Sequence, residues 1–435
     1  MPVLARAFLL ISLVLTVLGG LLIGIATRRV TRTHDIPPPP ISRATDPGEV
    51  ARGGRLFRTN CLPCHGGQVV APSGVDHASP GAVPPVVVAA SGGRVMGTPS
   101  FMGEIWAPNL TADRETGIGD WSDGALARLL RNGLDRDGRY AATMPRFARL
   151  GDADVAALIG FLRSNDPLVA PRPNRVPRPG LSLAGTLALA FAAGVDTRGE
   201  PRVVMPARGP TAAYGGYLAA SVYACVDCHT EGFGTTDEKL RSPVLLAGGQ
   251  FHRTPDGETI YSTNLTPDPE TGLGTQTRAD LEHLLTTGIG HAGIPARPPM
   301  PVFRNLDAEE SAALFAYLRS VPAVARKTPG ATREAPTPTA EPERLFSTLG
   351  CGVCHGERAP HQARLDEQAA ALSAMELAET IRHPETRNPA SQMPSYASVL
   401  DQTTSLRLAE WIRAEWPRRA LAARRHPHAE GPSLE

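Results

Sequence analysis

Apolar residues recur at helical spacing in several separate parts of the chain. In 152–163, valine, leucine and isoleucine stand three or four positions apart, and the same spacing returns in 308–319 and 406–416. Apolar side chains so spaced share one face, which predicts three amphipathic helices. A fourth helix-like run, 372–381, contains Met375, which we expect to fill a gap in a protein core.

A longer apolar run occupies the N-terminal region. Residues 7–26 carry no charge and follow Arg6. About 20 apolar residues are enough to cross a bilayer, so the run favours an uncleaved membrane anchor. The small residues at 24–26 also fit a signal-peptide cleavage site, and cleavage is the alternative. The arginines between positions 28 and 32 would face the outside of the membrane, against the usual positive-inside tendency.

A second uncharged run, 181–195, is too short to cross a bilayer comfortably. It predicts either a helix on the membrane surface or a buried helix between domains. Proline-rich stretches at 37–40, 167–179 and 329–342 predict extended linkers. The arginine- and histidine-rich end, 418–428, predicts a solvated tail, with contact to anionic lipid as the alternative.

Composition limits the size of each core. The 435 residues carry a net charge of +1, which removes the electrostatic reason to expect nucleic acid as a partner. Hydrophobic residues make up 42% of the chain, so we expect most of it to fold. Glycine (43) and proline (42) are abundant and aromatic residues reach only 5%, which indicates small cores with long loops. Such cores need an additional stabilising element.

All six cysteines fall in three copies of one pattern, C-x-x-C-H. On a helix, positions i, i+3 and i+4 share one face, so two thiols and an imidazole point the same way. This geometry allows two thioether bonds to a haem edge while the histidine binds the iron, and the pattern is typical of c-type haem attachment. We therefore expect three covalently bound haem c groups. The predicted binding residues are Cys61, Cys64 and His65, then Cys225, Cys228 and His229, then Cys351, Cys354 and His355.

Three other uses of paired cysteines fit less well. A zinc ribbon places its two C-x-x-C pairs about 15–20 residues apart, far closer than these motifs lie. A thioredoxin-like redox pair occurs once and needs no histidine after it. Structural disulfides in an oxidising compartment are the remaining alternative. Three copies that use every cysteine favour haem over each of these.

Methionine–proline pairs supply candidates for the second axial ligand of each iron. Histidine and methionine together are a known ligand pair in electron-carrying cytochromes. Proline holds the residue before it extended, so the sulfur projects from a loop. One pair lies downstream of each haem motif, which predicts Met144, Met300 and Met393 as ligands. Met96 and Met102 are rivals for the first iron, His252, His291 and His361 are the next candidates, and Met205 shows that a Met-Pro pair alone is not diagnostic.

The first two haem segments repeat each other. The element N-L-T-A-D-R-E-T-G-I-G at 109–119 matches N-L-T-P-D-P-E-T-G-L-G at 264–274, which indicates duplicated domains. Asp113 and Glu115 recur in the second copy as an aspartate and a glutamate, and glycines follow them in both copies. This favours a turn near the haem edge over acid–base chemistry. Each segment has the order short helix, haem motif, loop, methionine and closing helix. The third segment keeps this order but lacks the repeated element.

These motifs resemble those of a known family, the membrane-associated three-haem cytochrome c subunits of periplasmic dehydrogenases for alcohols, aldehydes and sugar acids such as gluconate. The resemblance rests on the three C-x-x-C-H motifs, the N-L-T-x-D-x-E-T-G-x-G element and the Met-Pro loops, and it covers 50–416. It implies His65, His229 and His355 as proximal ligands, with Met144, Met300 and Met393 as distal ones. The second motif continues as Thr230-Glu231-Gly232, where the family often has T-P-R, and the third segment is closer to a generic single-haem cytochrome.

The expected fold class is all-α, with three small cytochrome c-type haem domains in tandem after an N-terminal membrane segment. The expected divisions are 1–30 (anchor or signal peptide), 31–46 (proline-rich linker), 47–166 (first domain), 167–208 (linker with the apolar run), 209–325 (second domain), 326–340 (linker), 341–420 (third domain) and 421–435 (basic tail).

Haem is attached to C-x-x-C-H outside the bacterial cytoplasmic membrane, so the expected location is the periplasmic side of that membrane. The resemblance implies that electrons pass from a catalytic dehydrogenase subunit towards quinone or a downstream cytochrome or oxidase. No residue is assigned a catalytic role. Two alternatives stay open, a free-standing carrier to a terminal oxidase and a peroxidase or reductase with one iron that can open. No cysteine is left over to serve as an axial ligand.

Overall fold

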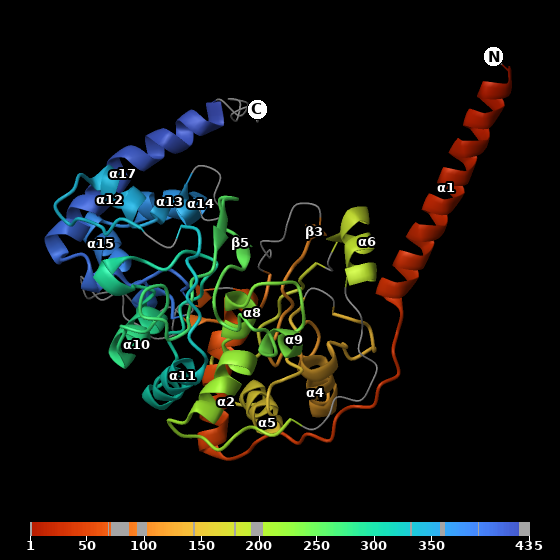
Figure 1. Ribbon diagram of the computed structural model, residues 1–435, viewed down its shortest axis with the longest axis horizontal. Coiled ribbons are helices and arrows are strands. Elements are labelled where there is room, and N and C mark those ends of the chain that lie inside the picture. Colours follow the sequence, from red (N-terminus) through yellow and green to blue (C-terminus); the bar gives the residue numbers. More distant parts are fainter. Residues whose placement is uncertain are drawn as a thin grey trace. The chain divides into compact units, whose positions relative to one another are not determined.

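Figure 1 shows the chain as a computed structural model, which describes residues 2–425 except 68, 71–86, 94–101, 142–143, 178–179, 193–202, 331–332, 357–361 and 390. The side chains of 2–6, 69–70, 87–88, 191–192, 362–364 and 416–425 lie outside the description as well. The chain forms two compact units. The first comprises Met1–Phe57, Cys64–Gln68 and Ala89–Met205, and the second comprises Arg58–Pro63, Val69–Val88 and Pro206–Glu435.

The part of the chain up to residue 205 contains six α-helices among its described residues. They are α1 (Pro2–Thr31), α2 (Pro47–Asn60), α3 (Leu62–His65), α4 (Asp123–Asn132), α5 (Asp152–Leu162) and α6 (Leu183–Ala192). Helix α2 precedes the first haem motif, α3 contains its last four residues, and α5 closes that segment. The predicted order of elements is therefore present in the first segment.

From residue 206 onwards, the described residues repeat this order twice. The second segment contains α7 (Ala212–Tyr217), the π-helix η2 (Leu218–Val222), α8 (Cys225–His229), α9 (Thr236–Leu240), α10 (Arg278–Thr287), the 3₁₀ turn η3 (His291–Gly293) and α11 (Ala308–Ser320). The third contains α12 (Pro342–Thr348), α13 (Cys351–His355), α14 (Gln362–Ala371), α15 (Ala374–Arg382), α16 (Pro384–Arg387), the 3₁₀ turn η4 (Tyr396–Ser398) and α17 (Gln402–Arg425).

Short strand pairs accompany the helices. The antiparallel pairs are β1 (Val69–Val70) with β2 (Val87–Val88), β3 (Gly103–Glu104) with β4 (Gly180–Leu181), and β5 (Phe251–Arg253) with β6 (Thr259–Tyr261). The prediction of a helix-rich fold is confirmed. The strand pairs are an addition to the expected all-α class, and they are too short to leave a clear alternating pattern in the sequence.

Glycine sets the packing of the closing helix in each of the first two segments. A Cβ added at Gly53 of α2 would stand 1.9 Å from the carbonyl oxygen of Ala157 in α5. A Cβ added at Gly215 of α7 would stand 1.9 Å from the carbonyl oxygen of Ala313 in α11. Only glycine permits a backbone approach this close. The helices predicted over 152–163 and 308–319 are confirmed as α5 and α11.

The two apolar runs form neighbouring helices. The most apolar 18-residue window of Ala7–Thr31 in α1 has a mean hydropathy of 2.7, and among the described residues this is the one helix long and apolar enough to cross a membrane. The second run forms α6, which packs beside α1 (Figure 1). Ala26 of α1 is fully buried, and Arg29 Nη1 donates a hydrogen bond of 3.5 Å to the carbonyl of Ala190 in α6. The apolar helix α6 therefore lies against the predicted anchor.

The core of the third segment forms around its closing helix. Helices α12, α14 and α15 pack on α17, and the rings of Phe346 and Trp411 lie 5.6 Å apart between centroids. Leu345, Leu377 and Leu408 are almost completely buried in this cluster. The helix predicted over 406–416 is confirmed, but it begins earlier, at Gln402, and continues to Arg425.

The core position predicted for Met375 is wrong. Met375 is 53% exposed on α15, where its sulfur lies 3.7 Å from Nε2 of Gln402. Leu377 and Ile381 are the apolar residues that α15 buries, together with Ala378. Met375 lies in the first turn, on a part of the helix that the core does not cover. Helical spacing predicts a shared face, but it does not tell which of two adjacent faces is buried.

Candidate haem-binding sites

Each C-x-x-C-H motif ends with a histidine at the C-terminus of a short helix. Helices α8 and α13 contain the whole motif, while α3 begins one residue after Cys61. Ala224 (φ 52°) and Gly350 (φ 72°) adopt the left-handed conformation directly before α8 and α13, so each helix starts abruptly at its first cysteine. The predicted helical conformation of the motifs is confirmed, and it directs the two thiols and the imidazole to one side.

The histidines of the first two motifs each make the same kind of hydrogen bond, from the imidazole to a backbone carbonyl. Nδ1 of His65 lies 2.8 Å from the carbonyl oxygen of Pro108, and Nδ1 of His229 lies 2.8 Å from that of Thr263. An imidazole that donates from Nδ1 keeps Nε2 free to bind a metal. Burial lowers the pKa of both histidines, in His229 to about 4, against a smaller opposing effect of these hydrogen bonds. Both rings are therefore neutral at pH 7, as a metal ligand must be.

The repeated element holds in place the carbonyl of Pro108, which is the hydrogen-bond partner of His65. Asn109 directly follows Pro108, and its Oδ1 accepts hydrogen bonds from the backbone N (2.9 Å) and Oγ1 (2.8 Å) of Thr111. Its Nδ2 donates to Oγ1 of Thr116 (3.1 Å) and to the carbonyl of Arg172 (2.8 Å). A single side chain thus closes the turn and ties it to the segment after α5.

The second copy reproduces this arrangement. Oδ1 of Asn264 accepts from the backbone N (2.9 Å) and Oγ1 (2.8 Å) of Thr266, and Nδ2 donates to Oγ1 of Thr271 (3.1 Å) and to the carbonyl of Val324 (2.8 Å). The sequence analysis recognised this element only as a repeat and missed the role of its asparagines. The signal was present, because each asparagine opens the repeated element directly after the residue whose carbonyl faces a histidine.

The acidic residues of the repeat form turns, as predicted. Oδ1 of Asp113 accepts from the backbone N and Oγ1 of Thr116, both at 2.7 Å. Asp268 makes the same contacts with Thr271, at 2.7 and 2.6 Å. These hydrogen bonds, the side-chain bond most of all, lower the pKa of both carboxyl groups. Glu115 forms an exposed ion pair with Arg175 instead of facing a reaction site.

The cysteines are all free thiols in the structure. None of the six is in a disulfide, and all six lie within the described residues. Burial raises the pKa of Cys225 and of Cys351 to about 12. Across the described residues, no three or more Cys, His, Asp or Glu side chains are grouped to hold a metal ion.

The third motif and its predicted methionine line one pocket. Cys351 and His355 of α13 and Met393 of the later loop face this pocket together. Its other walls are mostly apolar and come from α12, α14, α15 and α17: Phe346, Leu365, Gln368, Leu377, Thr380, Ile381, Leu408 and Ile412. A thiol, an imidazole and a thioether on mostly apolar walls are the set of groups expected to hold a covalently attached haem with two axial ligands.

The other two predicted methionines lie in loops at matching places. Met144 lies between α4 and α5, and Met300 lies between α10 and α11. Both are half-buried, and the backbone N of each donates 3.0 Å to a carbonyl three residues earlier, that of Ala141 and that of Arg297. The two methionines therefore make the same backbone hydrogen bond.

The rival ligands have other surroundings. The carbonyl of Met102 accepts a 3.1 Å bond from Ser182 beside the β3–β4 pair, and the sulfur of Met205 lies 3.8 Å from Nη2 of Arg52. Nε2 of His252 lies 3.2 Å from the carbonyl of Cys228. His291 is exposed in η3, and Met96 and His361 lie outside the described residues.

With this geometry in place, the class of the protein follows from comparison with known proteins. Residues 48–162 match the family described as cytochrome c oxidase, cbb3-type, subunit III. The first haem segment is therefore similar to a cytochrome c family, and the comparisons support covalently bound haem c in this chain.

Individual relatives are cytochrome subunits of dehydrogenases. The chain is 30% identical to the fructose dehydrogenase cytochrome subunit of Gluconobacter japonicus, over 54% of this chain and 48% of that relative. It is 30% identical to the alcohol dehydrogenase (quinone) cytochrome c subunit of Gluconobacter oxydans (52% and 48%), and 31% identical to the gluconate 2-dehydrogenase cytochrome c subunit of Pantoea cypripedii (55% and 51%). The chain spans about half the length of these relatives. The predicted resemblance to this group is confirmed.

Proposed function

We propose that this chain is a membrane-anchored cytochrome with three haem c groups. It carries electrons from a partner dehydrogenase towards quinone or another respiratory acceptor, on the periplasmic side of the cytoplasmic membrane. The observation that carries the proposal is the third pocket, where Cys351, His355 and Met393 meet among apolar side chains. A site with one imidazole and one thioether closes both axial positions of an iron, which suits electron transfer and disfavours substrate binding at the metal.

The residues of each motif have separate roles in this proposal. The pairs Cys61 and Cys64, Cys225 and Cys228, and Cys351 and Cys354 form the thioether bonds. His65, His229 and His355 bind on one side of the iron, and Met144, Met300 and Met393 bind on the other. Haem supplies a one-electron redox centre when bound. The protein orients the ligands, as the carbonyls of Pro108 and Thr263 do for their histidines.

The membrane part of the proposal rests on α1 and α6. An apolar helix of this length fits an anchor, although a cleaved signal sequence passes the same test of length and hydropathy. The packing of α6 on α1 does not separate the two outcomes, because Arg29 and Ala190 would both remain in the chain after cleavage at 24–26. Separation of cell membranes followed by mass measurement of the chain tests this. A shortened chain in the soluble periplasmic fraction would contradict the anchor.

The partner is inferred from the relatives. They are named as cytochrome subunits of fructose, alcohol and gluconate dehydrogenases, and we propose a catalytic dehydrogenase subunit for this chain as well. Affinity isolation from gently solubilised membranes tests the partner. Recovery with a flavin, quinone-cofactor or molybdenum subunit supports it, and recovery with a terminal oxidase alone would favour a free-standing carrier.

The haem number and ligation need two measurements on natively matured protein. Intact mass is expected to show three added porphyrins, with no thiol open to alkylation. Carbon monoxide titration of the reduced protein is expected to show no stoichiometric binding, because both axial positions of every iron are filled. Fewer than three porphyrins would contradict the haem count. One carbon monoxide per chain would favour an enzyme with one iron that opens.

A further inference from the structure

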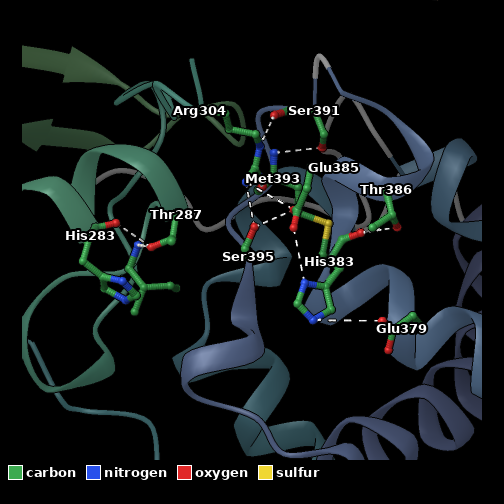
Figure 2. A network of polar contacts seen from close by, with 11 residues as sticks. His283, Thr287, Arg304, Glu379, His383, Glu385, Thr386, Ser391, Met393 and Ser395 are labelled. Carbon is green, nitrogen blue, oxygen red and sulfur yellow. Dashed lines mark hydrogen bonds and ion pairs between the residues drawn. The ribbon is translucent and has the colours of Figure 1, made fainter. Parts of the chain in front are cut away.

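One arginine of the second haem segment brackets the predicted methionine ligand of the third. Arg304 lies in the loop after Met300, and its side chain is 12% exposed. Its Nε donates to the carbonyl of Ser391 at 3.1 Å, its Nη2 donates to the carbonyl of Met393, and its Nη1 donates to Oγ of Ser395 at 2.6 Å. Figure 2 shows the guanidinium between these groups, so one rigid fork contacts residues before, at and after the methionine.

Two further hydrogen bonds join the second and third segments. The backbone N of Val302 donates to Oε1 of Gln392 at 3.0 Å, and the backbone N of Ser395 donates to the carbonyl of Thr287 at 2.8 Å. The Met300 loop and the Met393 loop are therefore adjacent within one compact unit. These two hydrogen bonds are directional, so they specify position more than they contribute hydrophobic energy.

A carboxylate completes the arrangement. Oε2 of Glu385 lies 3.3 Å from Nη1 of Arg304 and accepts 2.6 Å from Oγ of Ser395. Burial lowers the pKa of Arg304 although Glu385 raises it in part, and an arginine stays charged at neutral pH all the same. Glu385 thus largely balances the positive charge of Arg304 beside the Met393 loop. The remaining effect of Arg304 on this loop is to hold its backbone in position.

We propose that Arg304 is a positioning residue that holds Met393 at the third haem from the neighbouring second segment. This inference rests on the proposed function, since it takes Met393 as an axial ligand. A thioether is a neutral, weak ligand, so its bond to iron depends on how well the protein holds the sulfur in place. Residues 391–395, which the structure describes, form no helix before the turn η4, and the carbonyls of Ser391 and Met393 bond to Arg304 instead. Ligation of the third iron thus depends on contact with the second segment.

The test uses the full, haem-loaded chain with Arg304→Gln. Loss of the fork is expected to free the Met393 loop and open the sixth position of one iron. Carbon monoxide binding by the reduced protein then rises from none towards one per chain. One of the three haems loses the weak near-infrared absorption of methionine-ligated ferric haem, and its midpoint potential falls, because methionine ligation raises the potential. Arg304→Lys keeps the charge but lacks the fork, and an intermediate effect is expected.

Two control variants separate position from charge and from general damage. Arg304→Gln with Glu385→Gln removes both charges, so the effect of Arg304→Gln is expected to persist in the double variant. Restoration of the wild-type spectrum in the double variant would show that an uncompensated carboxylate, not loop position, caused the change. Arg319→Gln removes an exposed arginine whose Nη1 bonds the carbonyl of Gly274 at 2.7 Å, and no spectral change is expected.

Met393→Ala distinguishes failure of this inference from failure of the proposed function. If Met393→Ala opens an iron while Arg304→Gln leaves spectrum, potential and carbon monoxide binding unchanged, the positioning role is wrong and the ligand assignment stands. If Met393→Ala changes none of these, the ligand assignment itself is wrong. Should Arg304→Gln fail to accumulate, the same readouts on Arg304→Lys decide, and wild-type behaviour of that variant would contradict the need for a fork.

Discussion

The first and second haem segments share the framework around the motif histidine and differ in the partner of a buried carboxylate on the closing helix. In both, an asparagine with the same four hydrogen bonds follows the carbonyl that faces the histidine. Both also place a glycine of the first helix against a carbonyl of the closing helix, at Gly53 and at Gly215. Duplication has thus retained the parts that orient the histidine and set the distance between the two helices.

The difference lies in what each closing helix buries at its third position. In α5 this residue is Asp154, which meets Nε and Nη2 of Arg52 at 2.5 and 2.8 Å in a completely buried ion pair. In α11 it is Glu310, which accepts 2.7 Å from the hydroxyl of Tyr223. A carboxylate is kept while its partner changes from a charged to a neutral donor. The haem-side geometry is therefore independent of how the buried carboxylate is satisfied.

The largest change in the free energy of unfolding is expected at the buried carboxylate, where the two segments differ. Asp154→Ala removes the carboxylate opposite a buried guanidinium and is expected to lower the free energy of unfolding by about 3–5 kcal/mol. Glu310→Ala removes a hydrogen bond to a neutral hydroxyl and is expected to cost about 1–3 kcal/mol. Urea unfolding followed by haem absorbance measures both. Equal losses would show that the two carboxylates have the same energetic role despite their different partners.

The same comparison shows what sequence patterns reveal about this protein. The haem motifs, the closing helices and the Met-Pro loops were predicted because each leaves a short local signal in residue type and spacing. The buried pair of Arg52 and Asp154 was not, since its members are far apart in the chain and neither belongs to a motif. Arg304 has no sequence signal either, because alanine stands at the matching place after Met144. Contacts between segments depend on packing, which local patterns do not encode.

The next largest effect tests the shared asparagine. Asn109→Ala and Asn264→Ala each remove two donors and an acceptor from a buried turn and are expected to cost about 2–3 kcal/mol of unfolding free energy. Because the contacts match, the two losses are expected to be similar. Each variant is also expected to shift the potential of its own haem only, as the carbonyl that orients the histidine moves. Asn305→Ala, outside the repeated element, is the control, and an equal loss there would contradict a specific role.

A smaller effect is expected where the two helix pairs cross. Gly53→Ala and Gly215→Ala each place a Cβ against a backbone carbonyl, which forces the helices apart and is expected to cost about 1–3 kcal/mol. Thermal unfolding of the full chain measures the loss. Gly180→Ala is the matched control, since its nearest neighbouring atom would stand 4.0 Å away, in ordinary contact. A loss at Gly180 as large as at Gly215 would point to backbone effects in place of helix crowding.

The smallest expected effect concerns acid stability of the repeated turns. Hydrogen bonds from Thr116 and Thr271 lower the pKa of Asp113 and Asp268 in the folded protein. A carboxyl with a lowered folded pKa contributes stability above its unfolded pKa and loses that contribution as the pH falls through the folded value. Asp113→Asn and Asp268→Asn keep an oxygen acceptor but remove the charge. Each is expected to be slightly less stable than the wild type at pH 7.

The direction of the pH effect decides whether charge or hydrogen bonding is responsible. If the charge matters, the difference between wild type and variant begins to close near pH 4, where the carboxyl of the unfolded chain becomes protonated, and it closes fully only below the lowered pKa of the folded protein. Unfolding midpoints from pH 7 down to pH 3 measure this for both copies. A difference that stays constant over this range would mean that the turn needs only an oxygen acceptor. A difference in one copy alone would show that the two turns, despite matching contacts, are not energetically equivalent.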